Sequence, residues 1–388
     1  MPGHDDSLAR DFRAPVDTAR LAPRLDRTHG GDVGALAHSA GIEAGEILDF
    51  SASINPLGPP ASARKAFVKS YEEISRYPDA YGKKLKEALA ERHGMSPAEV
   101  LVGNGSTQLI YLLCAALRPR TALVVGPAFS EYANALTLGG ANISQFTLNH
   151  DDAFEFSMPR FMAAWDKDCD IVILATPNSV TGRLIPRAEI ETIARVALRR
   201  KSFVLVDEAF IDFVEKESVK TLVRNNPFLI VLRSLTKYYA LPGLRLGYLF
   251  GAPRRVAQLG AYQEPWSVNA PASNVALACL RDGRFTMKTE CWLEKEREFL
   301  SERLTVIEGL HPFASRANFL LVRIATTGLD ALQLRFFLST RKILIRACDS
   351  FAGLGADYFR VAVKRRKDNL RLLAALREWV EPWQSKLF

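Results

Sequence analysis

Residues 228–237, FLIVLRSLTK, join a short apolar run to a serine and a lysine three positions apart. A run this short and this rich in Val, Ile and Leu is typical of a strand buried on both faces of a parallel sheet. Serine followed three residues later by lysine is common by chance, so the position of the motif matters more than its letters. Open α/β sheets bind ligands at the carboxyl ends of their strands, so we expect Ser234 and Lys237 to lie at a site.

Similar short apolar runs occur on both sides of this stretch. Short apolar runs separated by helical patterns predict an α/β fold, with a mostly parallel central sheet flanked by helices. The other predicted strands are 100–102, 122–125, 171–175, 203–206 and 246–250. After about residue 285 the pattern changes to that of a smaller α+β unit, with helices at 290–308, 331–338 and 368–380 and strands at 319–324, 343–345 and 359–363.

These patterns predict three segments. Residues 1–28 are polar and lack periodicity, so we expect a flexible N-terminal extension. Residues 29–284 should form an N-terminal arm and the large domain, and residues 285–388 the small C-terminal domain. The first residues lack the apolar core of a signal peptide, and no stretch is long and apolar enough to span a bilayer, which predicts a cytoplasmic protein without membrane partners.

The composition narrows the class of partner. The chain has 388 residues with 51 basic and 43 acidic side chains, a formal net charge of +8. The basic residues are mostly spread among acidic ones, which argues against nucleic acid and suits a small anionic substrate and an anionic cofactor. The five cysteines form no CxxC pair, so neither a disulfide framework nor a metal site is expected.

Three further motifs follow predicted strands. Asp207 ends a buried run, where it could either cap the next element or serve a site. Residues 176–182, TPNSVTG, are by themselves a Pro/Asn/Gly turn. Residues 103–107, GNGST, place glycines and then hydroxyls at the start of a helix, which fits a phosphate cradle or a plain helix cap equally well.

In this order and spacing, the motifs resemble those of fold-type-I pyridoxal-phosphate enzymes of the class I/II aminotransferase family, from about residue 29 to residue 380. The resemblance implies that pyridoxal 5'-phosphate is held as a Schiff base by Lys237 and that Asp207 pairs with its pyridine nitrogen. It further implies that Asn178 donates to the ring 3-oxygen and that Phe129 stacks on the ring. The implied phosphate ligands are Gly105, Ser106, Thr107, Ser234 and Arg245.

The resemblance also implies a homodimer and a substrate site. Tyr77 matches a tyrosine that reaches the cofactor phosphate of the partner subunit, and Arg360 matches an arginine that binds the substrate carboxylate. Two subgroups compete, the histidinol-phosphate aminotransferases and the threonine-phosphate decarboxylases of cobalamin synthesis. The segments at 29–31, 48–58, 207–213 and 234–248 are more similar to the decarboxylases, in which His29, Gly30, Asn55 and Arg346 would also bind substrate.

Two departures from the family pattern bear on the chemistry. The loop after Asn178 lacks the usual proline, although the asparagine itself is kept. Phe210 stands where many aminotransferases carry a tyrosine, so the ring oxygen loses one donor and the pKa of the Schiff base should be less depressed. The phenylalanine favours a reaction other than ordinary transamination.

The expected activity is therefore decarboxylation of L-threonine O-3-phosphate to (R)-1-amino-2-propanol O-2-phosphate, for the cobalamin nucleotide loop. Three alternatives stay open: a histidinol-phosphate-type aminotransferase, a decarboxylase of L-serine O-phosphate, and a non-catalytic regulator that kept the fold. Serine phosphate lacks one methyl group, and such a difference is worth only ~1–3 kcal/mol in a binding pocket.

Overall fold

The computed structural model describes residues 29–384, so the predicted flexible extension at 1–28 lies outside the described residues. Its centre is a seven-stranded sheet in the order β2-β8-β7-β6-β5-β3-β4, in which only β8 runs against its neighbours. The strands are β2 Val100–Asn104, β3 Thr121–Gly126, β4 Asn142–Thr147, β5 Ile171–Ala175, β6 Phe203–Asp207, β7 Leu229–Ser234 and β8 Leu246–Gly251. The mostly parallel sheet predicted from the apolar runs is confirmed.

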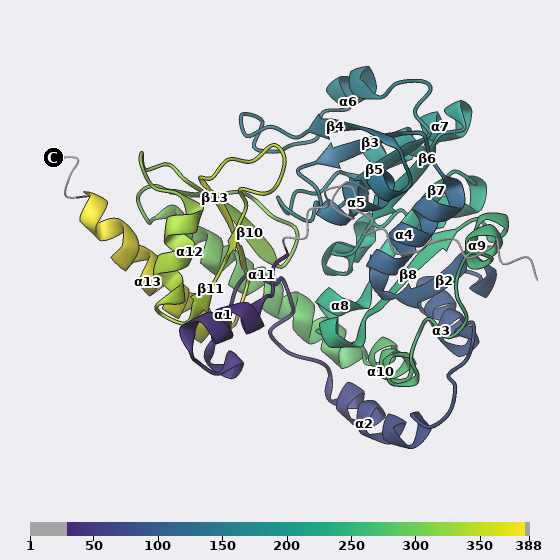
Figure 1. Cartoon of the computed structure of the whole chain (residues 1–388), viewed down its shortest axis with the longest axis horizontal. Helices are drawn as coiled ribbons and strands as arrows, with labels where there is room; N and C mark the ends of the chain where they lie inside the picture. Colours follow the sequence, from purple (N-terminus) through teal and green to yellow (C-terminus); the bar gives the residue numbers. More distant parts are fainter. Residues whose placement is uncertain (1–28, 385–388) are drawn as a thin grey trace, which may run out of the picture.

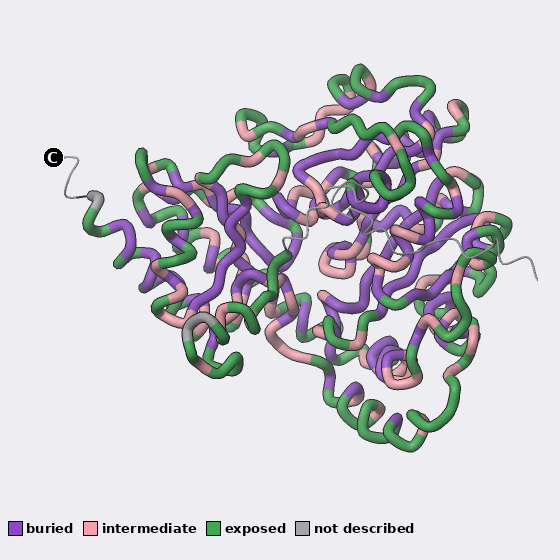
Figure 2. Tube along the Cα trace, viewed as in Figure 1, coloured by how far each residue is buried: buried purple, intermediate pink, exposed green. Residues whose placement is uncertain are grey.

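Helices cover both faces of this sheet (Figure 1). One face packs against α4 Gly105–Leu117, α5 Ser130–Leu138 and α9 Pro253–Gly260. The other packs against α3 Lys83–His93, α6 Met158–Ala164, α7 Arg187–Arg200 and α10 Ala270–Leu280. Because apolar side chains leave both faces of the central strands, those strands are buried along their whole length, as Figure 2 shows.

A second, antiparallel sheet lies in the C-terminal part, in the order β12-β13-β10-β9. Its strands are β9 Leu310–Pro312, β10 Phe319–Ile324, β12 Arg346–Ala347 and β13 Tyr358–Ala362, and it has a core of its own with α11 Gly283–Thr305, α12 Ala331–Ser339 and α13 Arg366–Gln384. The predicted small α+β unit is thus present, while the exact domain boundary at residue 284 stays a prediction.

The N-terminal arm belongs in space to this second part. Helix α1 (Val33–Ala40) leads to β1 (Leu48–Asp49), which pairs in parallel with β11 (Ile343–Leu344) (Figure 1). The chain then crosses through α2 (Ala61–Lys69) to the large sheet. Residues 50–55, just after β1, therefore run between the two sheets. Within residues 29–384, no helix is long and apolar enough to cross a bilayer.

Two expectations were wrong in detail. Strand β4 was not predicted, because it is an edge strand whose exposed residues interrupt any apolar run. The long helix predicted at 290–308 is α11, which begins at Gly283, where the Asp282 side chain accepts from the Phe285 N–H, and ends at Thr305. Gly309, which follows the predicted end of the helix, takes a positive φ of 81° in the turn into β9.

Candidate active site

Three of the predicted site residues follow adjacent parallel strands of the large sheet. Asp207 ends β6, where it pairs in register with Ala175 of β5 and Leu232 of β7. Asn178 follows β5, and Lys237 lies in the single turn of α8 (Leu235–Tyr238) that follows β7. Because the carboxyl ends of parallel strands meet at one edge of a sheet, the topology brings a lysine, a carboxylate and an amide to the same place.

The amine of Lys237 has a lowered pKa. Burial lowers its pKa to about 8, helped by the positive charges of Arg360 and Arg245 and opposed by Asp207. The ammonium nitrogen Nζ lies 5.9 Å from the centre of the Phe210 ring. A larger fraction of this amine is neutral near physiological pH than of an ordinary lysine, and the neutral form is the nucleophile that an aldehyde requires.

This pKa predicts how the cofactor-free protein captures an aldehyde. Because the folded-state pKa is lowered, the amine is protonated below about pH 8 and neutral above it. The rate at which Lys237 takes up added pyridoxal 5'-phosphate should therefore rise through this region and level off above it. Stopped-flow absorbance across a pH series measures the rate. A midpoint near the ordinary lysine value of about 10.4 would contradict the expectation.

Asp207 is buried and accepts two hydrogen bonds within the protein. Its Oδ1 accepts from the Ala209 N–H at 2.8 Å, and its Oδ2 accepts from the Tyr132 hydroxyl at 2.5 Å. Burial raises the pKa of this carboxyl group, while the Tyr132 and Ala209 hydrogen bonds and the charge of Lys237 lower it. An aspartate in this setting can hold a protonated pyridine nitrogen, the role that the resemblance implies.

The predicted phosphate cradle lies at the amino end of α4. Gly105 begins the helix at a φ of 77°, which an L-side chain rarely adopts, and a Cβ there would lie 2.6 Å from Nη2 of Arg245. The Ser234 hydroxyl lies 2.7 Å from the hydroxyl of Thr236, a residue that was not predicted to lie at the site. Hydroxyls, a guanidinium and unpaired helix N–H groups are the donors that a phosphate group needs.

Gly247 of β8 keeps this cradle tight. A Cβ on Gly247 would lie 2.3 Å from the backbone nitrogen of Ser106, and backbone cannot move aside cheaply. We expect Gly247→Ala to cost ~1–3 kcal/mol of unfolding free energy and to weaken cofactor binding. Gly251→Ala on the same strand is the matched control, since its Cβ would meet only Val256 at 3.4 Å. Equal cofactor affinity in the two variants, measured by fluorescence titration, would contradict the prediction.

Asn178 and Phe129 come from the loops that follow β5 and β3. The Asn178 side chain holds its own loop: Nδ2 donates to the Pro127 carbonyl at 3.0 Å, and Oδ1 accepts from the N–H groups of Val180 and Thr181 at 2.9 Å each. The amide has a second N–H, which suffices for the one donor that the prediction assigns to it. Phe129 packs edge-on against Tyr132 at 5.7 Å between ring centres.

Arg346 and Arg360 are cross-strand partners, in register on β12 and β13. Arg360 donates through Nη1 to the Ser179 carbonyl and through Nη2 to the Ser51 carbonyl at 3.4 Å, and its guanidinium lies 4.8 Å from the centre of the Phe319 ring. Burial lowers its pKa to about 10, and the nearby Arg346 acts in the same direction. Two guanidinium groups held this close favour a ligand with two anionic groups.

One N–H group of Arg360 is not hydrogen-bonded within the described residues. Its Nε is buried and has no hydrogen-bond partner among residues 29–384. Arg346 donates to the Ser350 hydroxyl at 3.1 Å and lies 5.0 Å from the Phe351 ring. A buried unsatisfied donor costs free energy, so Arg360 is poised to bind an acceptor that is not part of this chain.

The arm residues are placed differently from one another. His29 Nε2 lies 3.2 Å from Oε1 of the buried Glu131, a contact that the sequence did not suggest, and the His29 ring lies 6.0 Å from that of Phe129. Gly30 packs so closely that a Cβ would lie 2.6 Å from the Ser51 carbonyl oxygen. His29 thus lies beside Phe129, whereas Gly30 packs on the backbone of Ser51.

The placement of Asn55 argues against a direct substrate contact. Its Nδ2 donates to the Tyr238 carbonyl at 2.9 Å and to the Thr289 hydroxyl at 3.1 Å, and its Oδ1 accepts from the Leu57 N–H at 3.0 Å. Both amide hydrogens are therefore used within the protein. Since the Asn55 N–H also donates to the Lys237 carbonyl at 3.1 Å, the residue fixes the backbone around the lysine.

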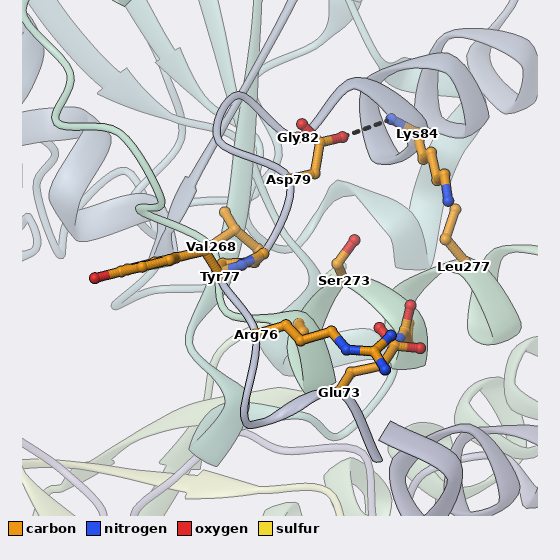
Figure 3. Close-up of a pocket in the computed structure, with 12 residues that line it drawn as sticks. Glu73, Arg76, Tyr77, Asp79, Gly82, Lys84, Val268, Ser273 and Leu277 are labelled. Carbon is orange, nitrogen blue, oxygen red and sulfur yellow. Dashed lines mark hydrogen bonds between the residues drawn. The ribbon is translucent and has the colours of Figure 1, made fainter. Parts of the chain in front are cut away.

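Tyr77 lies apart from this group. Its side chain is 82% exposed and packs on Trp266 at 4.8 Å between ring centres. It borders a cavity of about 250 Å³ between the loop before α3 and α10, and its hydroxyl points away from the other lining residues (Figure 3). Nothing within the described part of one chain brings Tyr77 to Lys237, so a role at a site would have to be exerted on another subunit.

Comparisons with known proteins agree with this architecture. The sequence profile of the family described as aminotransferase class I and II matches residues 45–376. The chain is 40% identical over 355 residues to a protein named threonine-phosphate decarboxylase from Salmonella typhimurium, covering 91% of this chain and 96% of that one.

Solved structures give the same result. The crystal structure of L-threonine-O-3-phosphate decarboxylase from Porphyromonas gingivalis is 26% identical, with a TM-score of 0.77 and coverage of 86% of this chain and 99% of that one. Histidinol-phosphate aminotransferase from Clostridium acetobutylicum is 28% identical, with a TM-score of 0.81 and coverage of 87% and 100%. The profile match, together with the identity to the Salmonella protein across nearly the whole of both chains, shows that this chain belongs to the class I and II aminotransferase family.

Proposed function

We propose that this protein is a pyridoxal-phosphate-dependent decarboxylase of L-threonine O-3-phosphate that forms (R)-1-amino-2-propanol O-2-phosphate. The observation that carries the proposal is a lysine of lowered pKa that feels the charges of the buried Asp207 and of Arg360, with Arg346 as the cross-strand partner of Arg360. The 40% identity to the Salmonella decarboxylase supports the same substrate. When bound, the cofactor supplies an electron sink for the electron pair that departing carbon dioxide leaves behind.

The two arginines would divide the two anionic groups of the substrate. The charge of Arg360 acts on Lys237, so Arg360 is the arginine nearer the amine, and the carboxylate is bonded to the same carbon as the substrate amine. Arg346 would bind the phosphate, together with His29 at the far side. A loose grip on the carboxylate suits decarboxylation, because strong binding of its charge stabilises the ground state more than the transition state.

Lys237 has a second role in this proposal. When substrate is bound, the amine of Lys237 would be available as an acid, and its lowered pKa suits proton transfer near neutrality. Lys237 would return the proton to the carbon that carbon dioxide leaves. Phe210 packs against Phe319 at 5.2 Å and places an apolar wall, rather than a hydroxyl, beside the Lys237 amine.

The division of anions makes a prediction about two variants. Arg346→Met should raise KM for threonine phosphate about 30-fold or more, the cost of breaking a buried charge pair, and should leave the weak binding of unphosphorylated threonine unchanged. Arg360→Met should weaken binding of both ligands, since both carry the carboxylate. Cofactor absorbance during ligand titration reports both affinities. The opposite pattern would assign the carboxylate to Arg346.

We further propose that the protein acts as a homodimer. The exposed Tyr77 packs on the exposed Trp266. Further exposed large side chains lie on and after α2, namely Phe67, Val68, Tyr71, Ile74 and Tyr81. Burying such a surface against a second copy would be favourable, and it would bring Tyr77 to the partner's cofactor phosphate. Light scattering should give twice the 43.1 kDa of one chain.

The reaction is tested by product analysis. Purified protein loaded with the cofactor is mixed with threonine phosphate, and carbon dioxide release is followed. It is then given histidinol phosphate with 2-oxoglutarate, and the formation of glutamate is followed. We expect carbon dioxide without sustained amino transfer. Steady transamination without carbon dioxide release would instead support the histidinol-phosphate aminotransferase alternative, and faster turnover of serine phosphate would revise the substrate.

A further inference from the structure

Tyr132 connects two residues that the proposed function places against the cofactor. It lies on α5, three residues after Phe129, and is 1% exposed. Its ring packs edge-on against Phe129, 5.7 Å between centres, and its hydroxyl donates to Oδ2 of Asp207. One side chain therefore supports both the residue expected on the ring face and the residue expected at the ring nitrogen.

The pKa shifts of the two partners indicate that Tyr132 is the donor and Asp207 the acceptor of this hydrogen bond. Burial alone pushes the pKa of Asp207 upward, toward a neutral carboxyl group, and the Tyr132 hydroxyl is the strongest influence that opposes it. The pKa of Tyr132 is itself raised well above its ordinary value, by burial and then by the charge of Asp207, so the phenol keeps its proton. Tyr132 is thus a fixed donor that favours the anionic form of Asp207.

Few other groups near Asp207 could replace the Tyr132 hydroxyl as a donor. Among the described residues, the groups that act on the Asp207 carboxylate are Tyr132 from α5, the Ala209 N–H from the next turn and the Lys237 ammonium from α8. The Ala209 N–H bonds the other oxygen, Oδ1. The Lys237 ammonium acts on Asp207 through its charge alone, and its nitrogen would be bonded to the cofactor when the cofactor is held. Tyr132 would then be the remaining side-chain donor to Asp207.

We propose that Tyr132 is a positioning residue that keeps Asp207 ionised and aimed, so that Asp207 can hold a protonated pyridine nitrogen. This proposal rests on the proposed cofactor but not on which substrate or reaction follows. A merely structural tyrosine would contribute packing, which phenylalanine preserves. If the tyrosine is needed as a donor that keeps Asp207 charged, its loss should instead change cofactor binding even when the fold is intact.

The test compares Tyr132→Phe with Tyr248→Phe in the full-length protein. Tyr248 is an equally buried tyrosine whose hydroxyl pairs with His93 at 2.9 Å, away from Asp207, so its variant removes the same group from a different place. Three quantities are measured for each: the dissociation constant of pyridoxal 5'-phosphate, the pH dependence of the visible absorbance of the bound cofactor, and kcat and KM separately. Thermal melting of the cofactor-free proteins checks the fold.

For Tyr132→Phe we expect cofactor affinity and kcat each to fall about tenfold or more, the usual worth of a hydrogen bond to a charged group, with KM little changed. The acid limb of the pH profile of the cofactor absorbance should move upward by roughly one unit, because Asp207 then protonates more readily. Tyr248→Phe should change none of the three. The proposal is overturned if Tyr132→Phe melts normally and matches the wild type in cofactor affinity and acid limb. Failure of the proposed decarboxylation would appear separately, as absence of carbon dioxide from the wild type.

Discussion

Lys237→Ala is expected to lower decarboxylation of threonine phosphate by at least ~10⁴-fold, because it removes both the covalent anchor of the cofactor and the proposed proton donor. The protein should still fold, since the lysine side chain contributes little packing and its backbone contacts, such as the Asn55 N–H to the Lys237 carbonyl, are kept. The variant should bind pyridoxal 5'-phosphate weakly and without the yellow colour of a lysine-bound cofactor.

Lys237→Arg is the companion variant. It keeps a positive charge beside Asp207 but cannot lose its proton or bind an aldehyde, so it should be as inactive as the alanine variant. Adding a small primary amine should restore part of the activity of Lys237→Ala but little of that of Lys237→Arg, where the guanidinium fills the space. Turnover of Lys237→Ala within tenfold of the wild type would refute the catalytic assignment.

Asp207→Asn is expected to give the second-largest loss, about 10²–10⁴-fold in kcat, the range for losing a positioned proton partner. Asparagine has nearly the same shape and its Oδ1 can still accept from the Ala209 N–H, but it carries no charge. The pyridine nitrogen would then lose its proton at neutral pH, and the ring would draw electrons less strongly. Absorbance spectra of the bound cofactor and steady-state kinetics measure both effects.

Glu208→Gln provides the control for this variant. Glu208 is the next residue and is fully buried, but it pairs with Arg233 at 2.9 Å and accepts from the Ser218 hydroxyl at 2.7 Å, not at the site. Removing its charge should lower the melting temperature by weakening a buried ion pair, while the cofactor spectrum stays unchanged. If Asp207→Asn affected only stability, as Glu208→Gln should, the assigned role of Asp207 would be wrong.

The sequence predicted the fold well where local patterns carry it. The strands that form the middle of the sheet are continuous apolar runs, and the motifs around Lys237, Asp207 and Asn178 immediately follow them. Strand β4 was not predicted, because an edge strand needs no apolar run. The end of α11 was predicted too late, at residue 308, whereas the helix ends at Thr305.

Side chains that meet across the fold could not be predicted in the same way. Tyr132 reaches Asp207 across 75 positions, and Phe319 lies under Arg360 although 41 positions separate them in the chain. Tyr132 follows Phe129 by three positions, but no local spacing in the sequence links Tyr132 to Asp207. Nothing in the sequence indicated that the amide hydrogens of Asn55 are bound by Tyr238 and Thr289 within the protein.

The central claim is that Lys237 holds the cofactor, and peptide mapping after borohydride reduction tests it most directly. Reduction fixes a lysine-bound aldehyde permanently, and mass spectrometry of the digested protein then shows which peptide carries it. We predict that the added mass lies on Lys237, with loss of turnover in proportion to labelling. Labelling of a different lysine, or no label on a protein saturated with pyridoxal 5'-phosphate, would contradict the account, as would full labelling of a protein that never had turnover to lose.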